Sequence, residues 1–188
     1  MSSTKISMHT HSAAIESLEI IWRNYLTVCE RVDLDACSPE QLEHYAQSPI
    51  RPFRIAAFHS RQGAFIAMWN LWEYYSRSLC GELPNKERQL KSESTVNWIG
   101  RSLASNNKPF SELNWFVQAN SLRNLIAHNG ARIDSGRTES QFKKASLAFD
   151  NLDTFSDGYL TLESSHVAEL KVKIESFIRE TTNYIVSE

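Results

Sequence analysis

The side chains best suited to chemistry in this chain fall within residues 121–130, which read S-L-R-N-L-I-A-H-N-G. Arg123, Asn124 and His128 place a guanidinium, an amide and an imidazole within six residues. A guanidinium binds phosphate oxygens as a planar fork and keeps its charge at any working pH. An imidazole has an ordinary pKa of about 6.5 and moves protons near neutral pH. This combination predicts a site that a bulky anion, or the same face of a second subunit, could approach closely.

The apolar residues around the motif recur at helical spacing, so we expect the last turns of an amphipathic helix that stops at Asn129-Gly130. With Leu122 at 0° and about 100° per residue, the buried stripe also includes Trp115, Ala119 and Ile126. Arg123 then lies near 100°, Asn124 near 200° and His128 near 240°, on either side of a polar face that contains Ala127. Because Arg123 and His128 point about 140° apart, we expect them to converge only if the helix end unwinds or two copies face each other.

This pattern, R-N-x-x-x-H at the end of a helix, resembles the HEPN superfamily, whose signature is an arginine, four to six residues and a histidine. Often Asn, Asp or His follows the arginine directly. The matching positions here are Arg123, Asn124 and His128. The resemblance implies a helical bundle that dimerises along the motif helix, with a composite cleft across the dimer and commonly metal-independent ribonuclease activity. Arg54 and His59 share the spacing, but Ile55 follows that arginine and no stop follows the histidine, so we expect that pair inside a continuing helix.

Three hypotheses for function follow. The first is a HEPN-type endoribonuclease, a toxin or defence effector that cuts RNA through 2′-hydroxyl attack, with Arg123, His128 and Asn124 as catalytic residues, no cofactor and no metal. Its partners would be the RNA substrate, a second copy in a homodimer, and an antitoxin or regulatory protein. The second is a catalytically silent HEPN-like helical dimer that binds RNA, a nucleotide or a partner protein. The third is a helical interaction protein in which the motif arises by chance, His128 only caps the helix and Arg123 only pairs with a surface acid.

Composition, net charge and cysteine content limit the classes of protein to which this chain can belong. The chain has 188 residues, of which 41% are hydrophobic, and this is typical of one globular domain. A net charge of −2 excludes a generally basic nucleic-acid coat, but residues 95–147 carry seven basic and three acidic side chains. That excess favours an anionic substrate, although ordinary scatter of surface charge explains it equally well. Three cysteines form no Cys-x-x-Cys pair, and neither a signal-peptide core nor a membrane span is apparent, so we expect reduced thiols and a cytoplasmic protein.

The expected fold is mainly α, a HEPN-like bundle of about five helices with a short β-hairpin before the C-terminal helix. We divide the chain into a flexible N-terminal tail over residues 1–11 and a single helical domain over residues 12–188. A polar loop, free to move, should occupy residues 82–94. The expected helices cover residues 12–32, 39–47, 53–80, 95–105, 111–129 and 167–185, with Ser94 capping the fourth and Ser164 or Ser165 the last. The hairpin should lie within residues 146–164 and turn at Asp157-Gly158.

Overall fold

Three long helices form the base of the molecule in a computed structural model that describes residues 3–32, 51–155 and 158–186. They are α1 (Ser3–Val32), α3 (Arg51–Glu82) and α7 (Ser164–Val186). Between α3 and α7 come the shorter elements α4 (Thr95–Ala104), α5 (Leu113–Asn129), α6 (Gly136–Ala145), β1 (Asp153–Thr154) and β2 (Leu160–Thr161). The prediction of a mainly helical fold with a hairpin before the last helix is confirmed. The helix expected over residues 39–47 lies outside the described residues.

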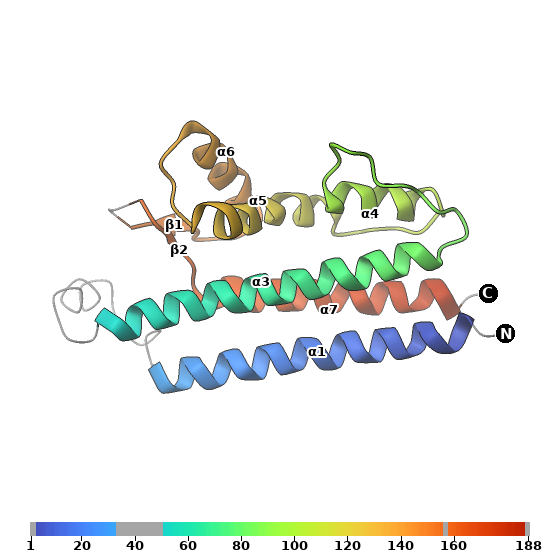
Figure 1. Cartoon of the computed structure of the whole chain (residues 1–188), viewed down its shortest axis with the longest axis horizontal. Helices are drawn as coiled ribbons and strands as arrows, with labels where there is room; N and C mark the ends of the chain where they lie inside the picture. Colours follow the sequence, from blue (N-terminus) through green and yellow to red (C-terminus); the bar gives the residue numbers. More distant parts are fainter. Residues whose placement is uncertain (1–2, 33–50, 156–157, 187–188) are drawn as a thin grey trace.

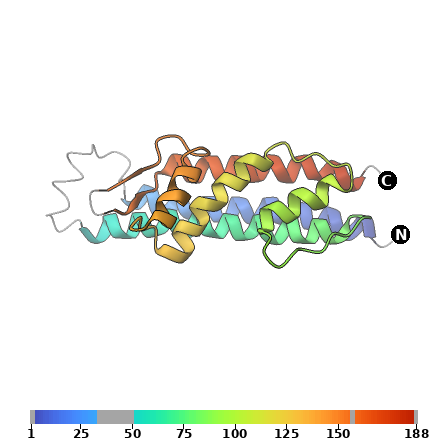
Figure 2. The ribbon, with the colours of Figure 1, turned by 90° about the horizontal axis from the view of Figure 1, so that it is seen from above.

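The elements are arranged in two levels. Helix α1 runs antiparallel to α3 and α7 and packs against both, and α1 begins at the end of the bundle where α7 ends (Figure 1). Helices α4, α5 and α6 lie across the side of α3 and α7 that faces away from α1 (Figure 2). The fold therefore presents α5, which carries the motif, on the outside of the three-helix base.

The N-terminal end of α1 differs from the expected flexible tail, because the helix begins at Ser3. His11 faces inward and is 6% exposed. Its Nδ1 contacts the Tyr75 hydroxyl of α3, which also hydrogen-bonds Thr181 Oγ1 of α7 at 2.7 Å. The spacing of apolar residues underestimates the length of such a helix, because a hydrogen-bonded polar side chain occupies an inward-facing position there.

Aromatic packing fixes α5 on the base. The Phe116 ring is fully buried and stacks on Trp72 of α3, with centroids 4.4 Å apart and planes 16° apart. It also meets Phe177 of α7 edge to face at 5.9 Å. Truncating such a buried aromatic side chain costs about 3–5 kcal/mol. Near the start of α5, a Cβ added at Gly100 of α4 would come within 2.7 Å of the Leu113 side chain, so glycine permits this close approach.

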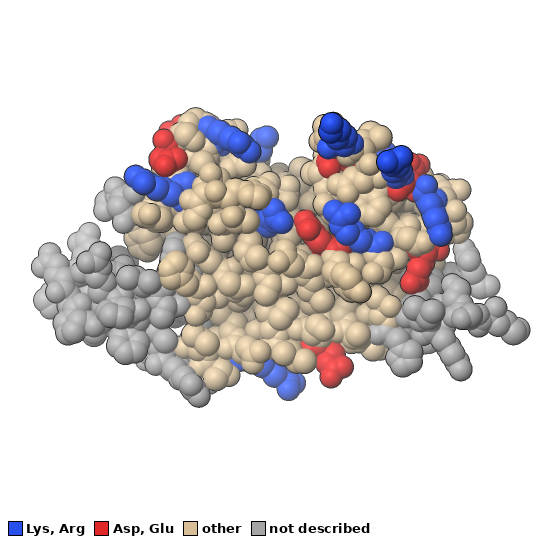
Figure 3. All heavy atoms as spheres, in the orientation of Figure 1, with Lys and Arg blue, Asp and Glu red and all other residues tan. Residues whose placement is uncertain are grey.

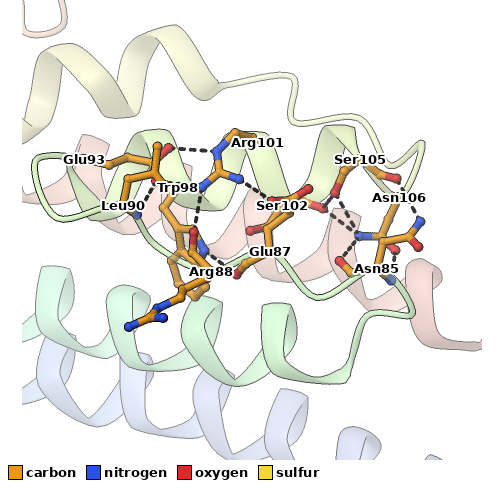
Figure 4. Close-up of polar contacts among 10 residues, drawn as sticks. All are labelled: Asn85, Glu87, Arg88, Leu90, Glu93, Trp98, Arg101, Ser102, Ser105 and Asn106. Carbon is orange, nitrogen blue, oxygen red and sulfur yellow. Dashed lines mark hydrogen bonds and ion pairs between the residues drawn. The ribbon is translucent and has the colours of Figure 1, made fainter.

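The polar segment before α4 is anchored, in contrast to the mobile loop that its composition predicts (Figure 4). The Arg101 guanidinium donates to Glu93 from Nε at 3.0 Å and from Nη2 at 2.8 Å. It also donates to the Arg88 carbonyl at 2.9 Å and to the Glu87 carboxylate. The predicted cap is confirmed, because Ser94 Oγ accepts from the third backbone N–H that follows it, at 3.2 Å. One arginine of α4 therefore holds the preceding loop in place.

The region between α5 and α7 departs most from expectation. Helix α6 has few apolar residues, so its periodicity is faint, and it starts at a capping box between Ser135 and Thr138. Phe149, expected in a strand, lies after α6 and is buried against the core, which leaves the hairpin only two residues on each side. Ser164 lies inside α7, where His166 Nδ1 accepts from the Glu163 N–H at 3.0 Å. An imidazole thus satisfies the backbone N–H just before α7, and Ser164, one of the two predicted caps, is the first residue of that helix.

Candidate functional site

The motif lies on an intact helix whose end matches the prediction. Helix α5 continues to Asn129, and Gly130 adopts the left-handed conformation at φ 55°. The Gly130 N–H and the Ala131 N–H both donate to the Leu125 carbonyl, the latter at 3.0 Å. Glycine takes this conformation without a steric penalty, which explains why the helix stops there. All three motif side chains therefore project from the last three turns of a regular helix.

The three motif side chains meet at one atom, Arg123 Nη1. This nitrogen lies 3.2 Å from Asn124 Oδ1 and 3.4 Å from His128 Nε2. A guanidinium has only donors, so in a hydrogen bond between these two groups the imidazole nitrogen is the acceptor. The contact to His128 is long for a hydrogen bond and is easily exchanged for a substrate.

The expectation that Arg123 and His128 of one copy would diverge is wrong. Their Cα–Cβ bonds leave the helix in different directions, but the long arginine side chain reaches round the helix surface to the next turn. Asn124 and His128, four residues apart, lie on one face, and the guanidinium closes on both. Helical angles give only the direction in which the Cα–Cβ bond leaves the helix. The long arginine side chain can place its guanidinium well away from that direction.

Burial divides the Arg123 side chain into an inner and an outer part. The residue is half-buried, and its Nε is buried without a hydrogen-bond partner among the described residues. His128 is exposed at the helix end, and Asn124 is half-buried. An unpaired buried donor costs about 1–3 kcal/mol, and Arg123 Nε shares this state with buried polar atoms elsewhere among the described residues, such as Trp72 Nε1 and Ser76 Oγ. The guanidinium thus presents its Nη edge, already oriented by Asn124, towards the exposed imidazole.

Two purely structural roles were expected as alternatives: a helix cap for His128 and a surface ion pair for Arg123. Neither role is supported. The terminal carbonyl that His128 might have capped accepts backbone N–H groups. Within residues 3–32, 51–155 and 158–186, no carboxylate forms an ion pair with Arg123. The second pair of the same spacing, Arg54 and His59, lies inside the continuous helix α3, as predicted. The motif at the end of α5 is therefore the better candidate.

A possible supporting pair on α3, Glu73 and Arg77, serves other purposes. Glu73 accepts from the Trp69 indole N–H at 3.0 Å. Arg77 donates to Gln89 at 3.1 Å and to Thr95 at 2.9 Å. These contacts stabilise α3 and the loop before α4, so neither residue supports the motif.

Positive charge gathers at the motif end of the molecule. Arg132, Arg137, Lys143 and Lys144 are exposed on α6 and on the segment that joins it to α5, and α6 packs against α5. Figure 3 shows lysine and arginine side chains over this end of the molecule. Elsewhere in the basic segment, Arg101 is bound by two carboxylates. The charge excess of residues 95–147 is thus effective mainly beside the motif, where it favours an anion.

Among the described residues, no group of three or more His, Cys, Asp or Glu side chains could hold a metal ion. No described helix has both the length and the apolar character needed to cross a bilayer.

Sequence reasoning missed one feature beside the motif. Arg132, just after α5, pairs with Tyr159 of the hairpin, and its guanidinium lies over the tyrosine ring. This pairing joins residues 27 positions apart in the sequence, so no local sequence pattern predicts it. Comparison of the chain with family models, with curated proteins and with solved structures found no match. The functional conclusion therefore rests on the site itself.

Proposed function

We propose that this protein is a metal-independent endoribonuclease of the HEPN type, acting as a toxin or defence effector in the cytoplasm. The observation that carries the proposal is the contact of Arg123 Nη1 with His128 Nε2 at the exposed end of α5. It supports the proposal because it places a permanent cation beside an imidazole nitrogen, a group that can accept a proton. A phosphate oxygen bound by the guanidinium would lie beside a base able to accept a proton from the neighbouring 2′-hydroxyl.

The reaction follows from these groups. His128 Nε2 takes the proton of the 2′-hydroxyl, and the 2′-oxygen attacks phosphorus. The bond from phosphorus to the 5′-oxygen breaks, and that oxygen takes up a proton, so the products are a 2′,3′-cyclic phosphate and a 5′-hydroxyl. Arg123 neutralises the charge that develops on the phosphoryl oxygens, and Asn124 holds the guanidinium in place.

A second copy would complete the site. One imidazole that has taken the 2′-proton must give it to the leaving oxygen or leave that step to another acid. In a two-fold dimer along α5, His128 of the second copy supplies this acid. The outer face of α5 supports close approach of two helices, because Ala127 is exposed and small and Val117 is 38% exposed.

Cleavage of RNA in the presence of EDTA tests the proposal. The purified protein is incubated with total RNA, together with the variants His128→Ala and His59→Ala. We expect the wild type and His59→Ala to cut, because His59 is an exposed residue of α3 far from the motif in sequence, and we expect His128→Ala to be inactive. Loss of activity in a folded His59→Ala with retention in His128→Ala would show that the wrong motif was chosen. RNA binding without any cutting would favour the catalytically silent alternative.

A further inference from the structure

The polar segment between α3 and α4 contains a strip, residues 86–91, that we call the basic loop. Exposure alternates along it, since Lys86, Arg88 and Leu90 are exposed, whereas Glu87 and Gln89 between them are half-buried. This alternation is the pattern of an extended chain with one side against the protein, because successive side chains of such a chain point to opposite sides. Two cations and a leucine therefore line the outer side of the basic loop.

Contacts on the inner side hold the basic loop against α3 and α4 (Figure 4). The carboxylates of Glu87 and Glu93 both form ion pairs with Arg101 of α4. The Gln89 side chain accepts from Arg77 of α3 at 3.1 Å and donates to the Glu93 carbonyl at 3.0 Å. Two arginines thus balance two glutamates on this side. The same contacts fix the outer side chains before a partner arrives, which lowers the entropic cost of binding.

The outer side of the basic loop is positively charged. Its cations, all exposed, are Lys86, Arg88 and Lys91. No carboxylate within the described ranges forms an ion pair with any of them, and the remaining acidic side chain nearby, Glu82, is the last residue of α3. Figure 3 shows lysine and arginine side chains projecting from this end of the molecule. Leu90, in the same loop, is 62% exposed, so an apolar contact is available beside uncompensated charge.

The basic loop is separate from the motif at the end of α5. In Figure 1, α4 and the loop before it lie at one end of the molecule's upper level, and α6 and the hairpin lie at the other. The motif belongs to the second end, because α6 packs against α5. A ligand of the basic loop is therefore distinct from an anion bound at Arg123.

Three kinds of polyanion carry the charge that this surface requires, and the neighbouring side chains favour a protein. Residues 82–94 contain no aromatic side chain on which a nucleic-acid base could stack. Anionic membranes are bound by clusters of about four to eight cations or by a broad apolar face, and the basic loop has three cations and one leucine. An extended acidic segment fits, because carboxylates at alternate positions can face cations at alternate positions.

We propose that the basic loop is a docking site for an extended acidic segment of a partner protein. The Arg88 guanidinium binds one carboxylate as a fork, and Lys86 binds another. Leu90 packs against an apolar side chain that follows these carboxylates in the segment. The inference goes beyond the proposed function and does not depend on it, because no residue of the motif takes part.

A peptide designed for this spacing tests the docking site. The probe is a short labelled peptide that alternates glutamate with threonine and carries one leucine, and its binding to the full chain is followed by fluorescence anisotropy at low salt. We expect Lys86→Glu together with Arg88→Glu to weaken binding by about ten-fold or more, because two attractions become repulsions. Lys143→Glu together with Lys144→Glu is the matched control, since it makes the same change of charge on α6 and should stay within about two-fold of wild type.

The apolar contact is tested in the same assay. Leu90→Ala should weaken binding by about three-fold or more, because part of the apolar area buried with the peptide is lost. Leu147→Ala is the matched control, since Leu147 is 71% exposed elsewhere on the surface, and it should change nothing. A peptide with glutamine in place of each glutamate should not bind, because its apolar side chain remains but its charges are gone.

Several outcomes would overturn the docking site. Failure of the wild type to bind the acidic peptide would do so, as would equal binding by the variant with Lys86→Glu and Arg88→Glu. The same variant is compared with wild type on single-stranded RNA and on vesicles containing phosphatidylserine. If it loses either of these while the peptide does not bind, the loop serves that ligand instead.

A second copy of this chain is the remaining occupant to exclude. Light scattering that shows a wild-type dimer, and a monomer after Lys86→Glu with Arg88→Glu, would assign the basic loop to self-association and overturn the proposal. Thermal melting checks that each variant is folded. The neutral pair Lys86→Gln with Arg88→Gln replaces the charge reversal if the reversed pair does not fold, and it too should weaken binding of the acidic peptide.

Discussion

Replacement of Arg123 by lysine separates the fork of the guanidinium from its charge. In the structure Nη1 is occupied by Asn124 and His128, whereas Nη2 makes no hydrogen bond among the described residues and remains for a phosphate oxygen. Lysine has one donor nitrogen in place of this fork. It can keep the contact to Asn124 or bind the phosphate, and it cannot do both in the same geometry.

The expected cost follows from that loss. One missing transition-state donor lowers kcat by up to about three powers of ten, and the retained charge recovers part of this. We therefore expect Arg123→Lys to cut RNA about ten to a thousand times more slowly. Stability should not fall, because the Arg123 Nε that is removed is buried without a hydrogen-bond partner among the described residues. Single-turnover rates with saturating protein in EDTA, beside a thermal melt, measure both quantities.

Arg137→Lys is the control for this experiment, since Arg137 is exposed on α6 and its guanidinium makes no hydrogen bond within the described part of the chain. Its rate should stay within about two-fold of wild type, the range of an ordinary surface substitution. If Arg123→Lys also stays within about two-fold, the guanidinium fork does not act on the phosphate and the reasoning fails.

Four further predictions concern assembly, stability and the order of the loop before α4. Light scattering should show a dimer at micromolar concentration, and a strict monomer would remove the second imidazole from the mechanism. Tyr75→Phe should lower the free energy of unfolding by about 1–3 kcal/mol in urea titrations, since it leaves the buried His11 without its hydroxyl partner; an unchanged midpoint would contradict this. Burial lowers the pKa of His11, so the folded protein binds fewer protons than the unfolded chain and loses stability as the pH falls below 6.5. His11→Asn should reduce the slope of the free energy of unfolding against pH by up to about 1.4 kcal/mol per pH unit. An equally steep slope in this variant would refute the prediction. Arg101→Ala should speed hydrogen exchange in residues 83–94, and unchanged protection there would show that the loop is held by other contacts.

Features determined by neighbours in the chain were predictable from sequence. The stop at Asn129-Gly130 depends on the left-handed conformation of one glycine, and the start of α4 depends on one hydroxyl, Ser94. Local chemistry was sufficient in each of these cases.

Features determined by long-range contacts were not predictable. The inward position of His11 in α1 depends on Tyr75, whose hydroxyl contacts it and also hydrogen-bonds Thr181. The approach of Arg123 to His128 depends on side-chain torsions, which helical angles do not include. The position of Tyr159 beside the motif depends on backbone pairing across an intervening helix.

The most direct measurement for the central claim is the chemistry of the cut ends. An RNA is prepared with a single 2′-O-methyl group at a mapped cleavage position, and its products are compared with those of unmodified RNA and of DNA, all in EDTA. The mechanism predicts that only unmodified RNA is cut at that position, because the 2′-hydroxyl is the nucleophile and His128 its base. The fragments should carry a 2′,3′-cyclic phosphate, or its hydrolysis product, and a 5′-hydroxyl. Fragments with 5′-phosphate ends, or an absolute need for a divalent ion, would contradict the account.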